Sequence, residues 1–301
     1  MAGVDTYAGG VARWERFAAR DAGLDLNPVC ASRALLQGHR TPRATVLLHG
    51  ITNCPQQWVR LAAELHRDGR NLLVPRYPHH GLRDRLNTDI ARLRADELVE
   101  TGEEVLAAAC GLGEQVTVIG LSLGGLLAAW LGERHQAVDV AVMVAPLFGI
   151  RRVPAAATPL LRTAAGRGPN LYLWWDSRLK AKLEPEHGYP RIATRAFGAL
   201  LELGHQVESA ARRSAPRART LVSVTNAADP AVDNGATRRL VRRWRGHGAD
   251  VREYEFPAAL GLPHDLIDPA HRATAVERVY PILLDLVRAA EAGTPTGTAR
   301  R

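Results

Sequence analysis

The sequence predicts an α/β fold in which a mostly parallel sheet is covered by helices on both faces. Short runs of β-branched and apolar residues alternate with helix-like segments along most of the chain, which is typical of parallel sheets. The runs at 44–48 and 138–144 are almost entirely apolar, as expected for strands that are buried on both faces. The length of 301 residues allows one large domain with an insertion.

The expected elements alternate in order along the chain. Residues 1–25 contain Trp14 and Phe17 at helical spacing and are expected to form an outer helix. Apolar runs predict strands at 29–36, 44–48, 71–75, 115–119, 138–144, 220–225 and 251–256. Amphipathic or capped segments predict helices at 56–68, 96–110, 123–133, 235–246 and 271–290.

The alternation stops near residue 148 and resumes after residue 219. Between these points lie prolines, aromatic residues and helix-like pieces, without a clear buried strand. The chain is therefore expected to form one α/β core from residues 1–150 and 220–290. Residues 151–219 are interpreted as an insertion in this core, and residues 291–301 as a flexible tail.

The net charge of +8 comes from arginines that are scattered over helix-like segments. They form no basic face with interleaved aromatic residues, so no nucleic-acid partner is expected. No run of about 18 apolar residues predicts a transmembrane segment. Residues 1–20 include Asp5 and Glu15 and lack the apolar stretch of a signal peptide, so a cytoplasmic location is expected. The sequence predicts no particular oligomeric state.

The three cysteines, Cys30, Cys54 and Cys110, include no C-x-x-C pair and do not indicate a zinc ribbon or a redox motif. No cluster of His, Cys, Asp or Glu has the spacing of metal ligands, and neither a metal nor another cofactor is expected. Cys30 and Cys54 flank the first core strands. A disulfide between them and two buried thiols are both compatible with the sequence.

The stretch Gly120-Leu-Ser-Leu-Gly124 lies between a predicted strand and a predicted helix. In this context Gly-x-Ser-x-Gly indicates a nucleophile elbow, a sharp turn that exposes the serine side chain above the sheet. Glycine at Gly120 and Gly124 lets the neighbouring backbone approach closely. The N-terminus of the following helix favours a developing oxyanion. The alternative interpretation is a glycine-rich turn with an ordinary serine.

A serine hydroxyl is a weak nucleophile unless a base takes its proton and a third group orients that base. An acid and a histidine follow in the order expected after an elbow serine. Asp229 follows the predicted strand at 220–225, and His264 follows the one at 251–256. Because the carboxyl ends of parallel strands meet at one edge of the sheet, both side chains are expected near Ser122.

With these residues the chain resembles the α/β-hydrolases, close in pattern to their carboxylesterase and monoacylglycerol-lipase-like members. The matching stretches are Leu47-Leu-His-Gly-Ile51, Gly120-Leu-Ser-Leu-Gly124, Asp229-Pro-Ala-Val232 and His264. The resemblance covers roughly residues 44–287. It implies the α/β-hydrolase fold, with residues 151–219 as a helical cap, or lid, over the site.

The resemblance also implies a role for each matching residue. Ser122 would attack the acyl carbonyl, His264 would take its proton and pass it to the leaving alcohol, and Asp229 would orient the imidazole. The backbone N–H groups of Ile51 and Leu123 would bind the oxyanion. The implied activity is that of a carboxylesterase that forms an acyl-enzyme from a small-molecule ester or a lipid-like substrate.

Asp233, four residues after Asp229, is the competing acid. The Asp-x-x-Val pattern of the resembling family favours Asp229. Asp265 is adjacent to His264 in sequence and is poorly placed to orient its ring. We expect Asp265 to be a turn or capping residue.

The other histidines are expected to have structural roles. His49 is expected to brace the loop after the strand at 44–48, and His79 and His80 to shape the rim of the site. His187 and His205 lie in the insertion, where surface or packing positions are expected.

An apolar and aromatic cluster in the insertion comprises Leu171, Tyr172, Trp174 and Trp175. It could line an acyl pocket or form the small core of the cap itself. Two alternatives to a carboxylesterase stay open. A lysophospholipase or monoacylglycerol lipase would work at a lipid surface, where the basic charge would help. A non-catalytic binding module on a hydrolase-like fold would leave the serine idle.

Overall fold

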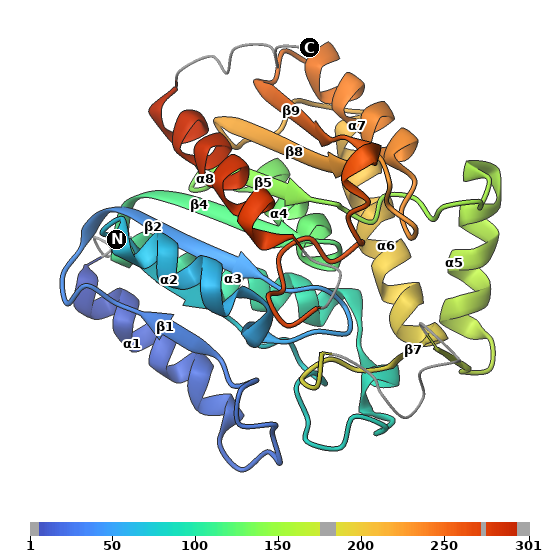
Figure 1. Ribbon diagram of the computed structural model, residues 1–301, viewed down its shortest axis with the longest axis horizontal. Helices are drawn as coiled ribbons and strands as arrows, with labels where there is room; N and C mark the ends of the chain where they lie inside the picture. The colour runs from blue at the N-terminus through green and yellow to red at the C-terminus, as the bar shows by residue number, and fades with distance from the viewer. Residues whose placement is uncertain (1–5, 175–184, 272–274, 294–301) are drawn as a thin grey trace.

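The structure, a computed structural model, describes residues 6–174, 185–271 and 275–293. Its centre is a seven-stranded sheet with the order β1-β3-β2-β4-β5-β8-β9 (Figure 1). The strands are β1 (Arg33–Leu35), β2 (Thr41–Leu48), β3 (Asn71–Val74), β4 (Gly113–Leu121), β5 (Val140–Val144), β8 (Thr220–Asn226) and β9 (Val251–Phe256). All neighbours are parallel except β1, which pairs antiparallel with β3. The predicted α/β fold with a mostly parallel sheet is confirmed.

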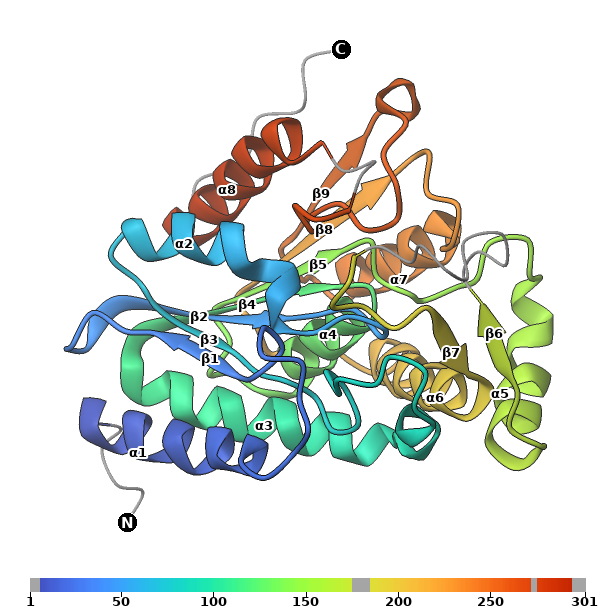
Figure 2. The ribbon, with the colours of Figure 1, turned by 60° about the horizontal axis from the view of Figure 1, so that its bottom comes forward.

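Helices cover both faces of this sheet (Figure 2). The helices of the core are α1 (Tyr7–Ala18), α2 (Val59–Arg67), α3 (Ala95–Leu112), α4 (Leu123–Arg134), α7 (Asn234–Gly246) and α8 (Val276–Ala292). Helices α2 and α8 pack on one face, and α1, α3, α4 and α7 pack on the other. Within the described residues, no helix is long and apolar enough to cross a membrane.

Successive residues of the central strands pack on opposite faces of the sheet. In β2, Val46 and Leu48 belong to the apolar cluster that includes α3 and α4, whereas Leu47 belongs to the cluster that includes α2 and α8. Since both faces are buried, both sets of positions are apolar, which accounts for the continuous apolar runs in the sequence. The loops at the carboxyl ends of these strands therefore start from a rigid frame.

Both ends of the core differ from the sequence expectation. The strand expected at 29–36 is reduced to β1, because the amides before it bond elsewhere: Cys30 N–H donates to Asn27 O at 2.8 Å and Ser32 N–H to Asp21 Oδ2 at 2.6 Å. Of the tail expected at 291–301, residues 294–301 lie outside the described residues, and residues 291 and 292 belong to a helix. Helix α8 continues to Ala292, and the Glu291 carboxylate is buried against Arg70.

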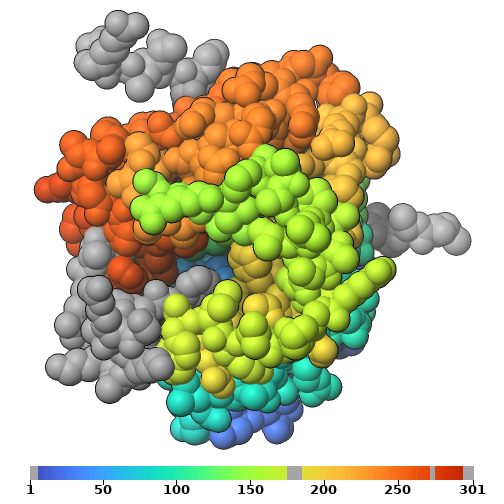
Figure 3. Space-filling view, turned by 90° about the vertical axis from the view of Figure 1, so that its right-hand side faces the viewer, coloured from blue at the N-terminus to red at the C-terminus, as the bar shows by residue number. Residues whose placement is uncertain are grey.

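The insertion between β5 and β8 contains α5 (Thr158–Arg167), β6 (Tyr172–Trp174), β7 (Arg191–Ala193) and α6 (Thr194–Ala211). Strands β6 and β7 form an antiparallel pair, which the sequence did not predict because each strand has only 3 residues. Helix α6 buries Ala196, Leu200 and Leu203 in the same apolar cluster as α4. Figure 3 shows a hollow on this side of the molecule, bordered by the insertion in green and yellow and by the orange C-terminal part.

Candidate active site

Ser122 occupies the sharp turn between β4 and α4. Its backbone has φ 56° and ψ −109°, a conformation that residues other than glycine rarely adopt. Its N–H donates to Val144 O on the neighbouring strand at 2.9 Å, which holds the turn against the sheet. The residue is only 4% exposed. The surrounding strands and helix therefore impose this strained conformation on the serine.

The glycines on either side of Ser122 are required by close backbone contacts. A β-carbon on Gly120 would lie 2.0 Å from Gly124 O, and one on Gly124 would lie 1.9 Å from Leu48 O. Any other residue at these positions would push α4 away from β4 or from the end of β2. The Gly-x-Ser-x-Gly spacing is therefore a steric requirement of this turn.

His264 connects Ser122 with Asp229. Its Nε2 lies 2.9 Å from Ser122 Oγ, and its Nδ1 lies 2.8 Å from Asp229 Oδ2. Because a carboxylate only accepts hydrogen bonds, Nδ1–H donates to Asp229, which leaves Nε2 to accept from the Ser122 hydroxyl. The sequence predicted that these three residues would meet, and the structure brings them together. An arrangement of this kind can remove the serine proton.

Asp229 is 1% exposed, and its Oδ1 accepts from the backbone N–H groups of Ala231 at 2.8 Å and Val232 at 3.1 Å. Burial by itself raises the pKa of this carboxyl. The hydrogen bonds from His264 and from the two amides outweigh burial, and the net pKa lies below its ordinary value. Asp229 is therefore ionised at neutral pH and suited to orient a histidine.

Asp233 and Asp265, the two other acids considered from the sequence, have different partners. Asp233 is the N-cap of α7, where its side chain accepts from Gly235 N–H at 2.8 Å. Asp265 Oδ1 accepts from the backbone N–H groups of Ile267 at 3.3 Å and Asp268 at 3.1 Å. Asp265 is thus a turn residue, as the sequence predicted, and Asp233 has a local capping role.

Asn226, the last residue of β8, was not indicated by any motif. Its Nδ2 donates to Leu262 O at 2.9 Å and to Pro263 O at 3.0 Å. One buried side chain thereby connects the loop that contains Asp229 with the loop that contains His264. The sequence signal was slight, an asparagine at the end of a buried strand, and its partners could not be read from it.

Two backbone amides can face a developing oxyanion. Leu123 is the first residue of α4, where N–H groups have no acceptor within the helix. Ile51 follows Gly50 in the loop after β2. The Gly50 carbonyl belongs to the same peptide group as the Ile51 N–H, and it accepts from His49 Nδ1 at 2.8 Å and from Asn53 N–H at 3.1 Å. These two bonds hold the carbonyl side of the peptide.

His49 braces this loop, as the sequence predicted, and is fully buried. Its Nε2 accepts from Tyr77 N–H at 3.4 Å, and burial lowers its pKa well below the ordinary value.

The rim position expected for His80 is wrong. His80 is also fully buried, with Nε2 at 2.5 Å from Ile51 O. Burial lowers its pKa to about 4, so it is neutral at neutral pH. His79 is half-buried, within 3.5 Å of a Glu97 oxygen.

His187 has a buried position, one of the two that were expected for it. It is 7% exposed, and its Nε2 lies 2.8 Å from Asp268 Oδ2, a specific polar partner that the sequence did not indicate. The sequence held no signal for this pair because its members are 81 residues apart. His205 is exposed on α6, as expected.

The aromatic residues of the insertion contact an arginine. Arg191 lies over the ring of Tyr172 at 4.2 Å and near that of Trp174 at 5.8 Å, and Tyr172 Oη donates to Thr88 O at 3.2 Å. Trp175 lies outside the described residues. The acyl pocket formed by these residues stays a prediction. Among the described side chains, no three His, Cys, Asp or Glu residues gather to hold a metal ion.

Cys30 and Cys54 form a disulfide, with their Cα atoms 5.2 Å apart. The sequence had left this pairing open. The bond joins the segment before β1 to the loop that contains Ile51. Disulfides persist mainly in oxidising compartments, so the cytoplasmic location stays a prediction that this bond does not favour.

Comparisons with known proteins agree with this architecture. A sequence model described as "Alpha/beta hydrolase family" matches residues 45–279. The thermostable monoacylglycerol lipase of Bacillus sp. (strain H-257) is 26% identical over 182 residues, which are 60% of this chain and 70% of that protein.

Solved structures share the fold. The monoacylglycerol lipase of Paleococcus ferrophilus has a TM-score of 0.63 at 18% identity, with 86% of this chain and 98% of that chain covered. A soluble variant of the monoglyceride lipase of Saccharomyces cerevisiae, in complex with a substrate analog, has a TM-score of 0.64 at 13% identity, with 88% and 92% covered. At such identities the similarity concerns the fold alone.

Proposed function

The chain belongs to the alpha/beta hydrolase family, and from this premise we propose that it is a serine hydrolase that cleaves carboxylic esters through an acyl-enzyme. The main support is the pair of hydrogen bonds by which His264 connects Ser122 Oγ with the buried Asp229 carboxylate. The similarity to a monoacylglycerol lipase supports an ester as the substrate class.

In the first half of the reaction, Ser122 Oγ forms a bond to the acyl carbon while its proton moves to His264 Nε2. The carbonyl oxygen becomes an oxyanion and accepts hydrogen bonds from the N–H groups of Ile51 and Leu123. The carbon–oxygen bond to the alcohol then breaks, and the leaving oxygen takes the proton from His264 Nε2. The alcohol departs and the acyl group stays on Ser122.

In the second half, water takes the place of the alcohol. His264 Nε2 accepts a water proton while the water oxygen attacks the acyl carbon, and the same two amides bind the oxyanion. The bond to Ser122 Oγ breaks, and Ser122 regains its proton from His264. Throughout, the Asp229 carboxylate stabilises the imidazolium and keeps Nε2 directed at Ser122. This carboxyl is ionised at neutral pH because its pKa lies below the ordinary value.

Residues 151–219 are proposed to form the cap over this site and to select the acyl group. A monoacylglycerol lipase is the second candidate, because the relative of that name is 26% identical over 182 residues. A lysophospholipase is a related candidate. A binding module with an idle serine is the candidate from another class.

The decisive experiment uses the full chain and its Ser122→Ala variant. Both are assayed on p-nitrophenyl esters of graded acyl length, on monoacylglycerols and on lysophospholipids, and both are treated with a fluorophosphonate probe. We expect hydrolysis and labelling of the natural chain, and loss of both in Ser122→Ala with an unchanged melting temperature. A preference for monoacylglycerol over the p-nitrophenyl esters would select the second candidate.

Two outcomes would overturn the proposal. Labelling that survives Ser122→Ala would show that another residue is the nucleophile. A well-folded natural chain that hydrolyses none of these esters and takes up no probe would support the binding module instead.

A further inference from the structure

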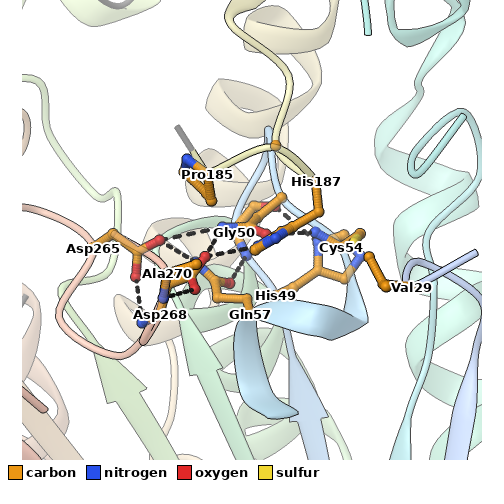
Figure 4. A network of polar contacts seen from close by, with 12 residues as sticks. Val29, His49, Gly50, Cys54, Gln57, Pro185, His187, Asp265, Asp268 and Ala270 are labelled. Carbon is orange, nitrogen blue, oxygen red and sulfur yellow. Dashed lines mark hydrogen bonds and ion pairs between the residues drawn. The ribbon is translucent and has the colours of Figure 1, made fainter. Parts of the chain in front are cut away.

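A buried polar network lies beside the candidate active site and contacts three segments of the chain (Figure 4). Its centre is a pair of carboxylates, Asp265 and Asp268, in the loop that begins with His264. Side chains from the loop after β2 reach both carboxylates, and His187 of the insertion reaches Asp268. The network is therefore a connection between the loop of the proposed general base and the loop of a proposed oxyanion donor.

Gln57 makes this connection through both ends of its side-chain amide. Gly50 N–H donates to Gln57 Oε1 at 2.9 Å, and Gln57 Nε2 donates to Asp265 Oδ2 at 2.7 Å. A backbone N–H only donates and a carboxylate only accepts, so the orientation of the amide is determined by its partners. Gln57 is 1% exposed, so bulk solvent does not compete for either partner.

Gly50 is held on both sides of its α-carbon. Its N–H is held by Gln57, and its carbonyl is held by His49 and Asn53. The next N–H along the chain is that of Ile51, a proposed oxyanion donor. Rotation of the Gly50 backbone would redirect this N–H, and glycine has no side chain that resists such a rotation. The bond to Gln57 is therefore the restraint that the glycine itself cannot supply.

Asp265 is a fixed acceptor for Gln57. Its Oδ1 accepts from the backbone N–H groups of Ile267 and Asp268, and its Oδ2 also accepts from Asn53 Nδ2 at 3.2 Å. Burial and the neighbouring Asp268 raise the pKa of Asp265, and the bond from Gln57 opposes this shift. A well-held carboxylate next to His264 thus sets the position of the amide.

We propose that Gln57 is a positioning residue of the oxyanion hole, which sets the direction of the Ile51 N–H by joining Gly50 to Asp265. The inference rests on the proposed function, because it assigns a part of the same reaction. Gln57 acts through Gly50 and Asp265 and does not contact the substrate. It makes the geometry of the oxyanion donor depend on the loop that contains the general base.

The test compares Gln57→Leu, Gln57→Glu and Asp265→Asn with the double variant Gln57→Glu/Asp265→Asn. In the double variant, the carboxylate introduced at position 57 accepts from Gly50 N–H with one oxygen. Its other oxygen accepts from the amide introduced at position 265. The double variant thus keeps the bond from Gly50 N–H to position 57. It also restores the bond between positions 57 and 265, with position 265 now the donor and position 57 the acceptor. Gln56→Leu is the matched control, since it makes the same substitution on the neighbouring half-buried glutamine.

Three kinds of measurement are made on the full chain: kcat and KM for a p-nitrophenyl ester, the melting temperature, and the inhibition constants of a trifluoromethyl ketone and its methyl ketone analogue. The trifluoromethyl ketone adds to the serine and places an oxyanion at the donors, whereas the methyl ketone stays largely unreacted. The ratio of the two inhibition constants thus reports on the oxyanion hole and is insensitive to simple loss of binding.

Loss of one oxyanion donor costs about 10²–10³ in kcat, and a misdirected donor costs part of this. We expect kcat to fall about 10–100-fold in each Gln57 single variant with KM nearly unchanged, and the trifluoromethyl ketone to bind weaker by a similar factor. The double variant should recover most of the lost kcat. Gln56→Leu should behave as the natural chain.

A folded Gln57→Leu variant with unchanged kcat would overturn the inference. So would a loss of kcat that leaves the ratio of inhibition constants unchanged and that the double variant does not restore, because Gln57 would then be merely structural. Neither result touches the proposed function, which fails if labelling survives Ser122→Ala or if the well-folded natural chain hydrolyses no ester and takes up no probe.

Discussion

The two ends of the central sheet contain buried charged groups of different kinds. At the amino ends of the strands, Glu291 and Arg70 form an ion pair in which the side chains are 0% and 1% exposed. The Glu291 carboxylate also accepts from Thr117 Oγ1 at 2.7 Å and lies 3.3 Å from Arg43 Nε. At the carboxyl ends lie Ser122 and the groups that contact it.

The difference lies in whether a proton can move. The Glu291 carboxylate is surrounded by donors that stay protonated at neutral pH, so this group offers no proton acceptor for a reaction. At the other end His264 has an acceptor on one side and a hydroxyl on the other, and its side chain is 24% exposed. Burial with fixed charges thus stabilises the fold, while a histidine between a carboxylate and a serine can do chemistry.

The largest effect is expected from a substitution at the carboxyl ends of the strands, where Asp229 orients His264. Asp229→Asn should lower kcat/KM about 10³–10⁴-fold, because an amide does not hold the imidazole in the tautomer that accepts from Ser122. The matched control is Asp233→Asn, since asparagine also caps helices and should keep activity within about threefold. Ester hydrolysis of both variants is measured, and a larger loss in Asp233→Asn would exchange the roles of the two acids.

The next largest effect is expected at the amino ends of the strands, where Glu291 pairs with Arg70. Glu291→Gln leaves the buried Arg70 guanidinium with only the partly exposed Asp68 carboxylate, 3.8 Å away, and should lower the free energy of unfolding by about 3 kcal/mol. Catalysis by the folded fraction should be unchanged. Glu277→Gln on the same helix is the control, because its pair with Arg60 is exposed. Denaturant unfolding measures the free energy of unfolding of both variants. Equal stability of the two variants would contradict a structural role for Glu291.

Removal of the disulfide should have an effect of similar size. The bond closes a loop of 24 residues, and its loss in Cys30→Ala/Cys54→Ala should cost about 3 kcal/mol of stability. Cys110→Ala on α3 is the control and should keep the bond. Thiol titration of the unfolded, unreduced natural chain should detect one thiol, and detection of three would rule out the disulfide.

The last effect depends on pH and concerns Glu133, in the last turn of α4. Burial raises its pKa to about 7, while the hydrogen bond from Trp244 Nε1 opposes the shift. Because the folded state keeps a proton that the unfolded chain releases near pH 4.5, the fold loses stability as the pH rises toward 7. Glu133→Gln keeps an acceptor for Trp244 without the charge.

We therefore expect Glu133→Gln to be more stable than the natural chain by about 3 kcal/mol at pH 8, since the pKa rises from 4.5 to about 7 and one pKa unit corresponds to about 1.4 kcal/mol. The gain should shrink toward pH 5. Thermal unfolding at several pH values measures it, and a gain that is the same at pH 5 and pH 8 would show that the charge is not its cause.

The sequence by itself determined the α/β alternation, the position of the serine turn and the order of serine, acid and histidine. These features are local. Apolar periodicity within a strand or helix reflects which face is buried, and the steric need for Gly120 and Gly124 arises within a single turn and its nearest strand. The resemblance of such local stretches was enough to expect that Ser122, His264 and Asp229 would meet.

Tertiary structure alone decided the pairings of the buried polar residues. Asn53 and Asp268 are 215 residues apart in sequence, and Gln57 and Asp265 are 208 apart. A glutamine or an aspartate can form hydrogen bonds with many partners, so its identity does not specify which one it meets. The partner is fixed only when the packed strands bring distant loops to one edge of the sheet, where burial makes an unpaired polar group costly.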